Sequence, residues 1–217
     1  MIVTAQAPTL DNARVAQAYT RWAPVYDLAF AAVMGPGRKA AVRAAERAGS
    51  LVLDVGVGTG LELPLFGPRT TVVGVDLTLP MLARAAARVR VQGLGCVAGL
   101  LAMDANHLGF ADGAFDATLA PYLLPVVPDP ARTLDELARV TRRGGEIVLV
   151  NHFGAETGPV AHVEAWIGRH SASLGWRPQF SFSIVTDWIA ARADVRLIER
   201  RVVRPFGLFT LVRIARD

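Results

Sequence analysis

The sequence predicts an α/β fold, in which a mainly parallel sheet carries helices on both faces and ends in an antiparallel strand pair. Short apolar runs bounded by turn residues alternate with helical patterns, which is typical of a parallel sheet. Two strand-like segments then follow each other at the C-terminus, although a parallel nucleotide-binding sheet of the dehydrogenase kind needs no hairpin there. A length of 217 residues suits one domain.

Five apolar runs are expected to form successive strands, at residues 51–55, 71–75, 96–102, 115–120 and 145–150. Between them, Thr78 can cap a helix that ends at Gly93. A second helix is expected to begin at Asp129 and to end at the glycine pair 144–145. The C-terminal hairpin is expected from the segments 195–203 and 207–215.

Composition excludes several classes of protein. Hydrophobic residues make up 52% of the chain, but no run approaches the ~18–20 apolar residues that a membrane span needs. The stretch 1–14 lacks a basic head followed by an apolar core, so it does not resemble a secretory signal. The lone Cys96 excludes an internal disulfide and fits a reducing interior. We therefore expect a cytoplasmic protein.

The net charge of +4 is unevenly spread. Residues 1–50 sum to +3, residues 51–150 to −2 and residues 151–217 to +3. This distribution favours an anionic partner such as a phosphate group or an acidic membrane surface, with dispersed surface arginines as the alternative. No nucleic-acid motif is present, and no His, Cys or carboxylate set has metal-ligand spacing. We expect neither a nucleic-acid partner nor a metal.

A glycine-rich turn follows the first strand, with the sequence Gly56-Val57-Gly58-Thr59-Gly60. Glycines let main-chain amides approach a ligand closely and adopt positive φ. The spacing is G-x-G-x-G with Asp54 just before it, whereas a dinucleotide site would want G-x-G-x-x-G. A carboxylate here would repel phosphate but suits a cationic amino group.

Two further acids end the next strands. Asp76 is positioned to accept both hydroxyls of a ribose, and Met103 with Asp104 offers an apolar surface and an acceptor for an exocyclic amine. An ordinary turn carboxylate is the alternative for either acid alone. An amino acid, a ribose and an adenine together make S-adenosylmethionine, which is the cofactor that this set of residues predicts.

The ordered motifs DVGVGTG, VVGVDLT, AMDAN, FDATLAPYLLPVVPDP and RRGGEIVLV resemble the class I S-adenosylmethionine-dependent methyltransferases. The resemblance implies a Rossmann-like seven-stranded sheet with a reversed last strand. We expect residues 1–48 to form an N-terminal helical lid and residues 49–217 the catalytic core of a single domain. The cofactor, with S-adenosylhomocysteine as its product, is expected to contact Tyr19, Tyr26, Asp54, Gly56, Gly58, Gly60, Asp76, Leu77, Met103, Asp104, Ala120 and Tyr122.

A closer resemblance concerns the acceptor. YTRWAPVYD, VVPDPARTLDELARV, EIVLVNHFGAE and LGWRPQF are similar to the bacterial phospholipid N-methyltransferases of the Rhodobacter type. That family converts phosphatidylethanolamine stepwise, through monomethyl and dimethyl forms, to phosphatidylcholine at the inner face of the cytoplasmic membrane. Quinone and small-molecule methyltransferases share the cofactor half and the RWAPVYD-like opening, so they are the alternative. The VNHF motif separates the two interpretations.

The resemblance and the chemistry of the amine suggest the acceptor site. Because an ethanolamine ammonium must lose a proton, the candidates for orienting the amine or accepting that proton are Tyr19, Tyr26, Asn151 and His152. The candidates for substrate binding are Trp22 and Phe153, whose aromatic faces attract cationic nitrogen, and Arg177 for the lipid phosphate. A hydrogen-bonded structural histidine and aromatic packing onto the core are the competing interpretations.

The segment 10–34 is apolar on one face and is followed by Arg38, Lys39, Arg43 and Arg47. This pattern fits helices that lie in the membrane interface near anionic headgroups. Lid helices that close over the cofactor would show a similar pattern. We therefore expect peripheral association with the inner membrane through the N-terminal helices.

Overall fold

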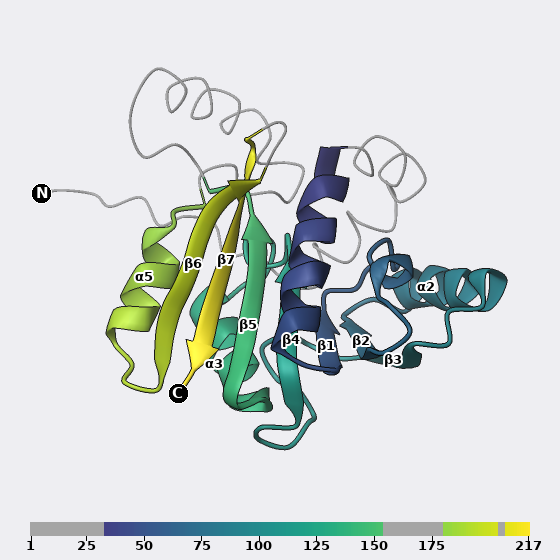
Figure 1. Ribbon diagram of the computed structural model, residues 1–217, viewed down its shortest axis with the longest axis horizontal. Coiled ribbons are helices and arrows are strands. Elements are labelled where there is room, and N and C mark those ends of the chain that lie inside the picture. Colours follow the sequence, from purple (N-terminus) through teal and green to yellow (C-terminus); the bar gives the residue numbers. More distant parts are fainter. Residues whose placement is uncertain (1–32, 154–179, 204–206) are drawn as a thin grey trace, which may run out of the picture.

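The computed structural model describes residues 33–153, 180–203 and 207–217, whose strands form one seven-stranded sheet (Figure 1). The strand order is β3-β2-β1-β4-β5-β7-β6. Strands β1 to β5 pair in parallel, whereas β7 is antiparallel to both β5 and β6. The bounds are β1 (Leu51–Val55), β2 (Thr71–Asp76), β3 (Val97–Ala102), β4 (Phe115–Pro121), β5 (Thr141–Asn151), β6 (Val195–Val203) and β7 (Phe209–Arg216).

The predicted Rossmann-like sheet with a reversed last strand is therefore confirmed, and the C-terminal hairpin supplies the reversed strand. Most of the predicted N-terminal lid, residues 1–32, lies outside the described residues. The lid, and the division into residues 1–48 and 49–217, stay predictions.

Helices cover both faces of the sheet (Figure 1). The helix over residues 33–48 and α2 lie on one face, and α3 and α5 lie on the other. Because strand side chains alternate between faces, neighbouring residues of β5 enter different cores. Val150 packs under the helix over residues 33–48 and α2, and Leu149 packs under α3 and α5. The bounds are α2 (Leu79–Gln92), α3 (Pro130–Val140), α5 (Ser183–Ala190) and the short 3₁₀ helix η1 (Leu63–Leu65).

The two predicted helices differ in how well their ends match the sequence. Helix α2 ends before Gly93, whose φ of 61° caps it in the left-handed conformation, as expected. Asp129 caps α3 by accepting a hydrogen bond from a backbone amide of its first turn. The predicted end of α3 at the glycine pair 144–145 is wrong, because the helix ends at Val140 and the pair lies inside β5.

The glycine pair has a different role in the structure. The pairing of β4 with β5 shifts register here, and a Cβ on Gly145 would lie 2.4 Å from the carbonyl oxygen of Asp116. Gly145 therefore lets β5 approach β4 closely. A local helix-end pattern does not distinguish this role from a helix stop.

The parallel strands place the predicted motifs at one edge of the sheet. The carboxyl ends of β1, β2, β4 and β5 all lie at this edge, which is where open α/β sheets bind ligands. None of the helices in the described parts of the chain is both long and apolar enough to cross a bilayer.

Candidate active site

A cavity of about 170 Å³ lies at the carboxyl edge of the sheet. Its walls come from the glycine-rich turn, the ends of β2, β3 and β4, the first turn of α2 and the helix over residues 33–48. Side chains lining it include Met34, Arg38, Glu62, Asp76, Leu77, Met81, Met103, Asp104 and Tyr122. The cavity is therefore mainly apolar with a few converging acids, which is typical of a small-molecule site.

The glycine-rich turn needs its glycines for two reasons. Gly56, Gly58 and Gly60 have φ values of 78°, 53° and 73°, a conformation that other residues rarely adopt. A Cβ on Gly56 would also lie 2.8 Å from Leu123, and one on Gly60 would lie 2.7 Å from Leu63. Next to Gly58 the space is open, since a Cβ there would meet nothing closer than 3.9 Å. A ligand can therefore approach the main chain at Gly58.

Asp54 is fully buried behind the cavity wall, and neither of its carboxyl oxygens has a hydrogen-bond partner in the described structure. Burial raises its pKa well above the ordinary value, and the neighbouring Glu62 carboxyl raises it further. Burial likewise raises the pKa of Glu62, which lines the cavity. Among the described residues, these two buried acids have Arg38 as their cationic neighbour, and a ligand ammonium group would suit them as a further partner.

Arg38 supplies the cation that faces this pair. Its Nε lies 3.3 Å from Oε2 of Glu62, its side chain lines the cavity, and the residue is only 8% exposed. The expectation that Arg38 faces anionic headgroups is therefore wrong. Glu62 was not among the predicted site residues, although a glutamate between Leu61 and Leu63 is a signal that a buried acid follows the turn.

Asp76 closes the turn from the end of β2. Its Oδ2 accepts a hydrogen bond from the Gly58 amide at 2.9 Å, and its Oδ1 accepts from the amide and hydroxyl of Thr78, each at 2.9 Å. A carboxylate has about four acceptor sites, so this one retains capacity for a ligand hydroxyl. Leu77, which is 41% exposed, and Met103 add the apolar wall beside it.

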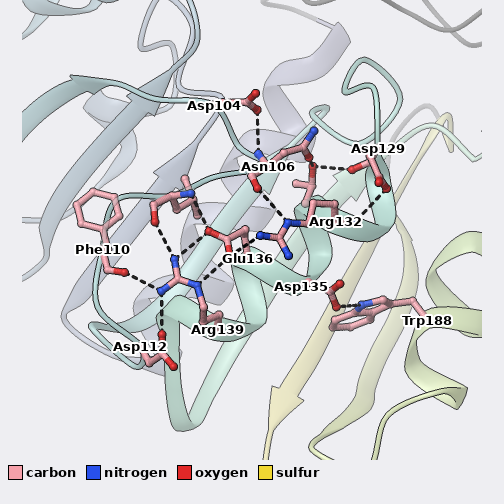
Figure 2. A network of polar contacts seen from close by, with 12 residues as sticks. Asp104, Asn106, Phe110, Asp112, Asp129, Arg132, Asp135, Glu136, Arg139 and Trp188 are labelled. Carbon is pink, nitrogen blue, oxygen red and sulfur yellow. Dashed lines mark hydrogen bonds and ion pairs between the residues drawn. The ribbon is translucent and has the colours of Figure 1, made fainter.

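The loop after β3 is fixed by α3 (Figure 2). The Thr133 hydroxyl donates to Oδ1 of Asn106 at 2.6 Å, and Glu136 accepts from the Leu108 amide at 2.7 Å. Arg139 donates to Glu136 at 2.8 Å and lowers the pKa of that carboxyl. Asp104 accepts from the Asn106 amide at 2.9 Å. The loop that offers Asp104 to the cavity is thus held in place by buried polar contacts.

Tyr122 connects three elements at the cavity. It has a positive φ of 62°, its amide donates to the Val150 carbonyl at 2.6 Å, and its hydroxyl donates to the Met34 carbonyl at 2.7 Å. A non-glycine residue held at positive φ is often part of a ligand site. Ala120, in contrast, is fully buried in the core. Pro121 lines the cavity wall, where the side chain of Ala120 was expected.

The end of β5 lies beside this wall through the Tyr122–Val150 hydrogen bond. Asn151 is fully buried, and its Oδ1 and Nδ2 have no hydrogen-bond partner in the described structure. Such an amide costs about 1–3 kcal/mol unless a ligand pairs with it. The Nδ1 of His152 lies 2.6 Å from the Leu208 carbonyl, so Nδ1 carries the proton and donates it. In neutral His152 the lone pair is therefore on Nε2.

Phe153 packs with Phe180 and Phe182, at ring-centroid distances of 5.9 Å and 5.0 Å. These contacts fit the alternative interpretation, in which the aromatic ring packs onto the core. The other acceptor-site candidates, Tyr19, Trp22, Tyr26 and Arg177, lie outside the described residues. No group of three His, Cys, Asp or Glu side chains within the described ranges is placed to hold a metal ion.

Comparison with known proteins agrees with this geometry. Residues 53–149 match the family model of a methyltransferase domain. The fold is similar to magnesium protoporphyrin IX methyltransferase from Synechocystis PCC 6803 with S-adenosylhomocysteine bound, with a TM-score of 0.70 and 16% identity over 95% of this chain and all of that one. Together, the fold and the site define an S-adenosylmethionine-dependent methyltransferase.

Two relatives resolve the family further. The chain is 44% identical over 204 residues to phosphatidylethanolamine N-methyltransferase of Cereibacter sphaeroides, covering 93% of this chain and 97% of that protein. It is 34% identical over 176 residues to demethylmenaquinone methyltransferase of Thermobifida fusca, covering 76% and 72%. The chain belongs to the family of the Cereibacter phosphatidylethanolamine N-methyltransferase.

Proposed function

We propose that the protein transfers methyl groups from S-adenosylmethionine to the amino headgroup of phosphatidylethanolamine, and onward through the monomethyl and dimethyl forms to phosphatidylcholine. The observation that carries this proposal is the 44% identity to the Cereibacter enzyme, which extends over 93% of the chain and therefore includes the acceptor half. The Asn151-His152-Phe153 segment at the end of β5 lies in that half, beside the cavity wall.

The residues of the cavity fit the cofactor. Asp54 and Glu62 are buried acids suited to the amino group of its methionine portion, and the Arg38 guanidinium beside them suits the carboxylate. Asp76 would accept from the ribose, while Leu77 and Met103 would cover the adenine. The cofactor supplies an activated sulfonium methyl group, and these residues would fix its direction.

The acceptor amine presents a second problem. An ethanolamine ammonium has a lysine-like pKa, so deprotonating it at pH 7 costs about 4 kcal/mol. Neutral His152 would accept that proton on Nε2, since its Nδ1–H is held by the Leu208 carbonyl. The unpartnered amide of Asn151 would orient the nitrogen lone pair, and the phenols of Tyr19 and Tyr26 would complete that arrangement.

Binding of the lipid headgroup would use aromatic and cationic side chains. Trp22 and the exposed part of Phe153 would contact the methylated nitrogen, since aromatic faces attract cations. Arg177 would pair with the phosphate.

The proposed substrate resides in a bilayer, so the proposal includes peripheral association with the cytoplasmic membrane through the N-terminal segment. Deleting residues 1–18 is expected to weaken co-sedimentation with vesicles that contain phosphatidylglycerol. Unchanged co-sedimentation of this truncated protein would exclude that role for the segment.

The direct test is to incubate the protein with methyl-labelled S-adenosylmethionine and, separately, phosphatidylethanolamine and its monomethyl and dimethyl forms, and to resolve the lipid products. We expect label in each of the three products. If demethylated quinones were labelled and ethanolamine lipids were not, the quinone alternative suggested by the Thermobifida relative would replace this proposal.

A further inference from the structure

A second hollow lies away from the cofactor cavity, between the helix over residues 33–48 and the C-terminal half of β6. It has a volume of about 570 Å³. Lys39, Arg43 and Arg47 line it from the helix, and Arg201 and Val202 line it from the strand. We call this feature the basic groove.

The cations of the basic groove form a line. Lys39, Arg43 and Arg47 are four residues apart in sequence, so they lie on one face of the helix and span about 12 Å. All three are exposed. Within the described part of the chain, none of the three has a carboxylate within 4.0 Å, whereas Arg201 pairs with Glu199 at 2.6 Å. Among the described residues, no carboxylate therefore neutralises the positive charge of these three side chains.

Carboxylates neutralise several other arginines of the fold. Arg38 on the same helix is paired with Glu62, and Arg139 and Arg213 each pair with two carboxylates. In the groove, by contrast, three exposed cations share one helix face beside a hollow. A row of unpaired cations of this length is suited to an extended anionic surface.

Exposed apolar side chains stand at the end of the groove. Val202, which lines it, is 57% exposed, and Leu208, at the start of the returning strand, is 48% exposed. The two belong to adjacent ends of the β6–β7 hairpin. Cations beside exposed apolar side chains match a lipid surface, where charged headgroups border a hydrocarbon interior.

We propose that the basic groove docks the protein onto the anionic headgroups of a membrane. No aromatic side chain lines the groove in the described structure, so it lacks the stacking platform that single-stranded nucleic acid needs. The line of cations is also longer than one phosphate requires. This inference rests on the proposed lipid substrate, and it assigns a membrane contact to the folded core in addition to residues 1–32.

The location of the groove relates it to the cofactor cavity. Both share the helix over residues 33–48, with Arg38 directed into the cavity and Lys39 into the groove. Pro36, at the end of the groove, precedes Gly37, where a Cβ would lie 2.0 Å from the Tyr122 hydroxyl. Docking through the groove would therefore hold the cavity close to the headgroups that carry the acceptor amine.

The test compares two full-length variants of equal charge. One is Lys39→Gln/Arg43→Gln/Arg47→Gln in the groove, and the matched control is Arg69→Gln/Arg84→Gln/Arg90→Gln, three exposed cations that line neither hollow. Binding is measured by co-sedimentation with vesicles of phosphatidylcholine, with and without phosphatidylglycerol. A cation near an anionic surface contributes about fivefold in affinity, so the groove variant is expected to lose roughly 100-fold on anionic vesicles. The control is expected to lose much less.

Equal losses in both variants would overturn the proposal, because net charge alone would then control binding. No loss in the groove variant would also overturn it, as would equally tight binding of the wild type to neutral vesicles.

A second assay separates this inference from the proposed function. Methyl transfer to a short-chain, monomeric phosphatidylethanolamine needs no membrane, so the groove variant is expected to keep wild-type turnover there. Loss of that turnover in the groove variant alone would overturn a pure docking role. Absence of turnover in the wild type would instead contradict the proposed function.

Discussion

The substitution Asp54→Asn is expected to change stability and cofactor affinity in opposite directions. Asp54 is fully buried without a hydrogen-bond donor in the described structure, and it lies against a second acid, Glu62. An asparagine of nearly the same shape could donate its amide to Glu62. Giving one unsatisfied buried group a hydrogen-bond partner contributes about 1–3 kcal/mol, which for a domain of this size corresponds to a Tm increase of roughly 2–12 °C.

The stability gained by Asp54→Asn should depend on pH. Because burial raises the pKa of Asp54, the folded protein binds more protons than the unfolded chain above the ordinary carboxyl pKa. The stability of the unliganded wild type therefore falls as pH rises from about 4 towards the raised pKa. The Tm difference between the variant and the wild type should be small near pH 4 and should grow towards neutral pH.

Cofactor binding should respond in the other direction. Losing a charged hydrogen bond to the ligand ammonium costs about 1.5–3 kcal/mol, so the Kd for S-adenosylhomocysteine should increase roughly 10- to 150-fold. Thermal melts across the pH range and titration calorimetry measure the two effects. A variant that melts no higher than wild type at neutral pH and binds S-adenosylhomocysteine equally well would refute the assigned role of Asp54.

Three other predictions follow from single contacts. Asn151→Ala removes a buried amide without a partner, so thermal stability should be kept or raised while kcat with phosphatidylethanolamine falls at least about tenfold; a normal kcat would remove Asn151 from the site. Gly37→Ala places a Cβ 2.0 Å from the Tyr122 hydroxyl and should lower the free energy of unfolding in urea by about 1–3 kcal/mol, whereas Gly35→Ala, with nothing within 4 Å, should not show that clash. Asp76→Ala removes an acceptor that also orders the glycine-rich turn, so the KM for S-adenosylmethionine should rise at least about tenfold; an unchanged KM would contradict its place at the ribose.

Local patterns in the sequence predicted the sheet and the cofactor loop well, because these features depend on short-range chemistry. The strand 51–55 and the positive φ of Gly56 and Gly58 follow from an apolar run and from bare backbone. The hairpin also follows from two neighbouring strand-like segments. In contrast, the glycine pair 144–145 was misassigned, because only the approach of β4 explains it.

Long-range pairing accounts for the site residues that the sequence did not reveal. Arg38 belongs to a row of helical cations, and only the fold directs it to Glu62 while Lys39 stays exposed. Ala120 illustrates the same limit, since strand alternation turned it into the core and left Pro121 at the cavity. A periodic pattern identifies a face of a helix or strand, but it does not say what that face will meet.

The most direct measurement is a crystal structure of the protein with S-adenosylhomocysteine. We expect the ligand to occupy the cavity beside Gly58, with its amino group next to the Asp54–Glu62 pair, its ribose at Asp76 and its adenine against Met103. A cavity that stays empty at saturating S-adenosylhomocysteine, or a ligand whose adenine lies against the acid pair, would contradict this expectation.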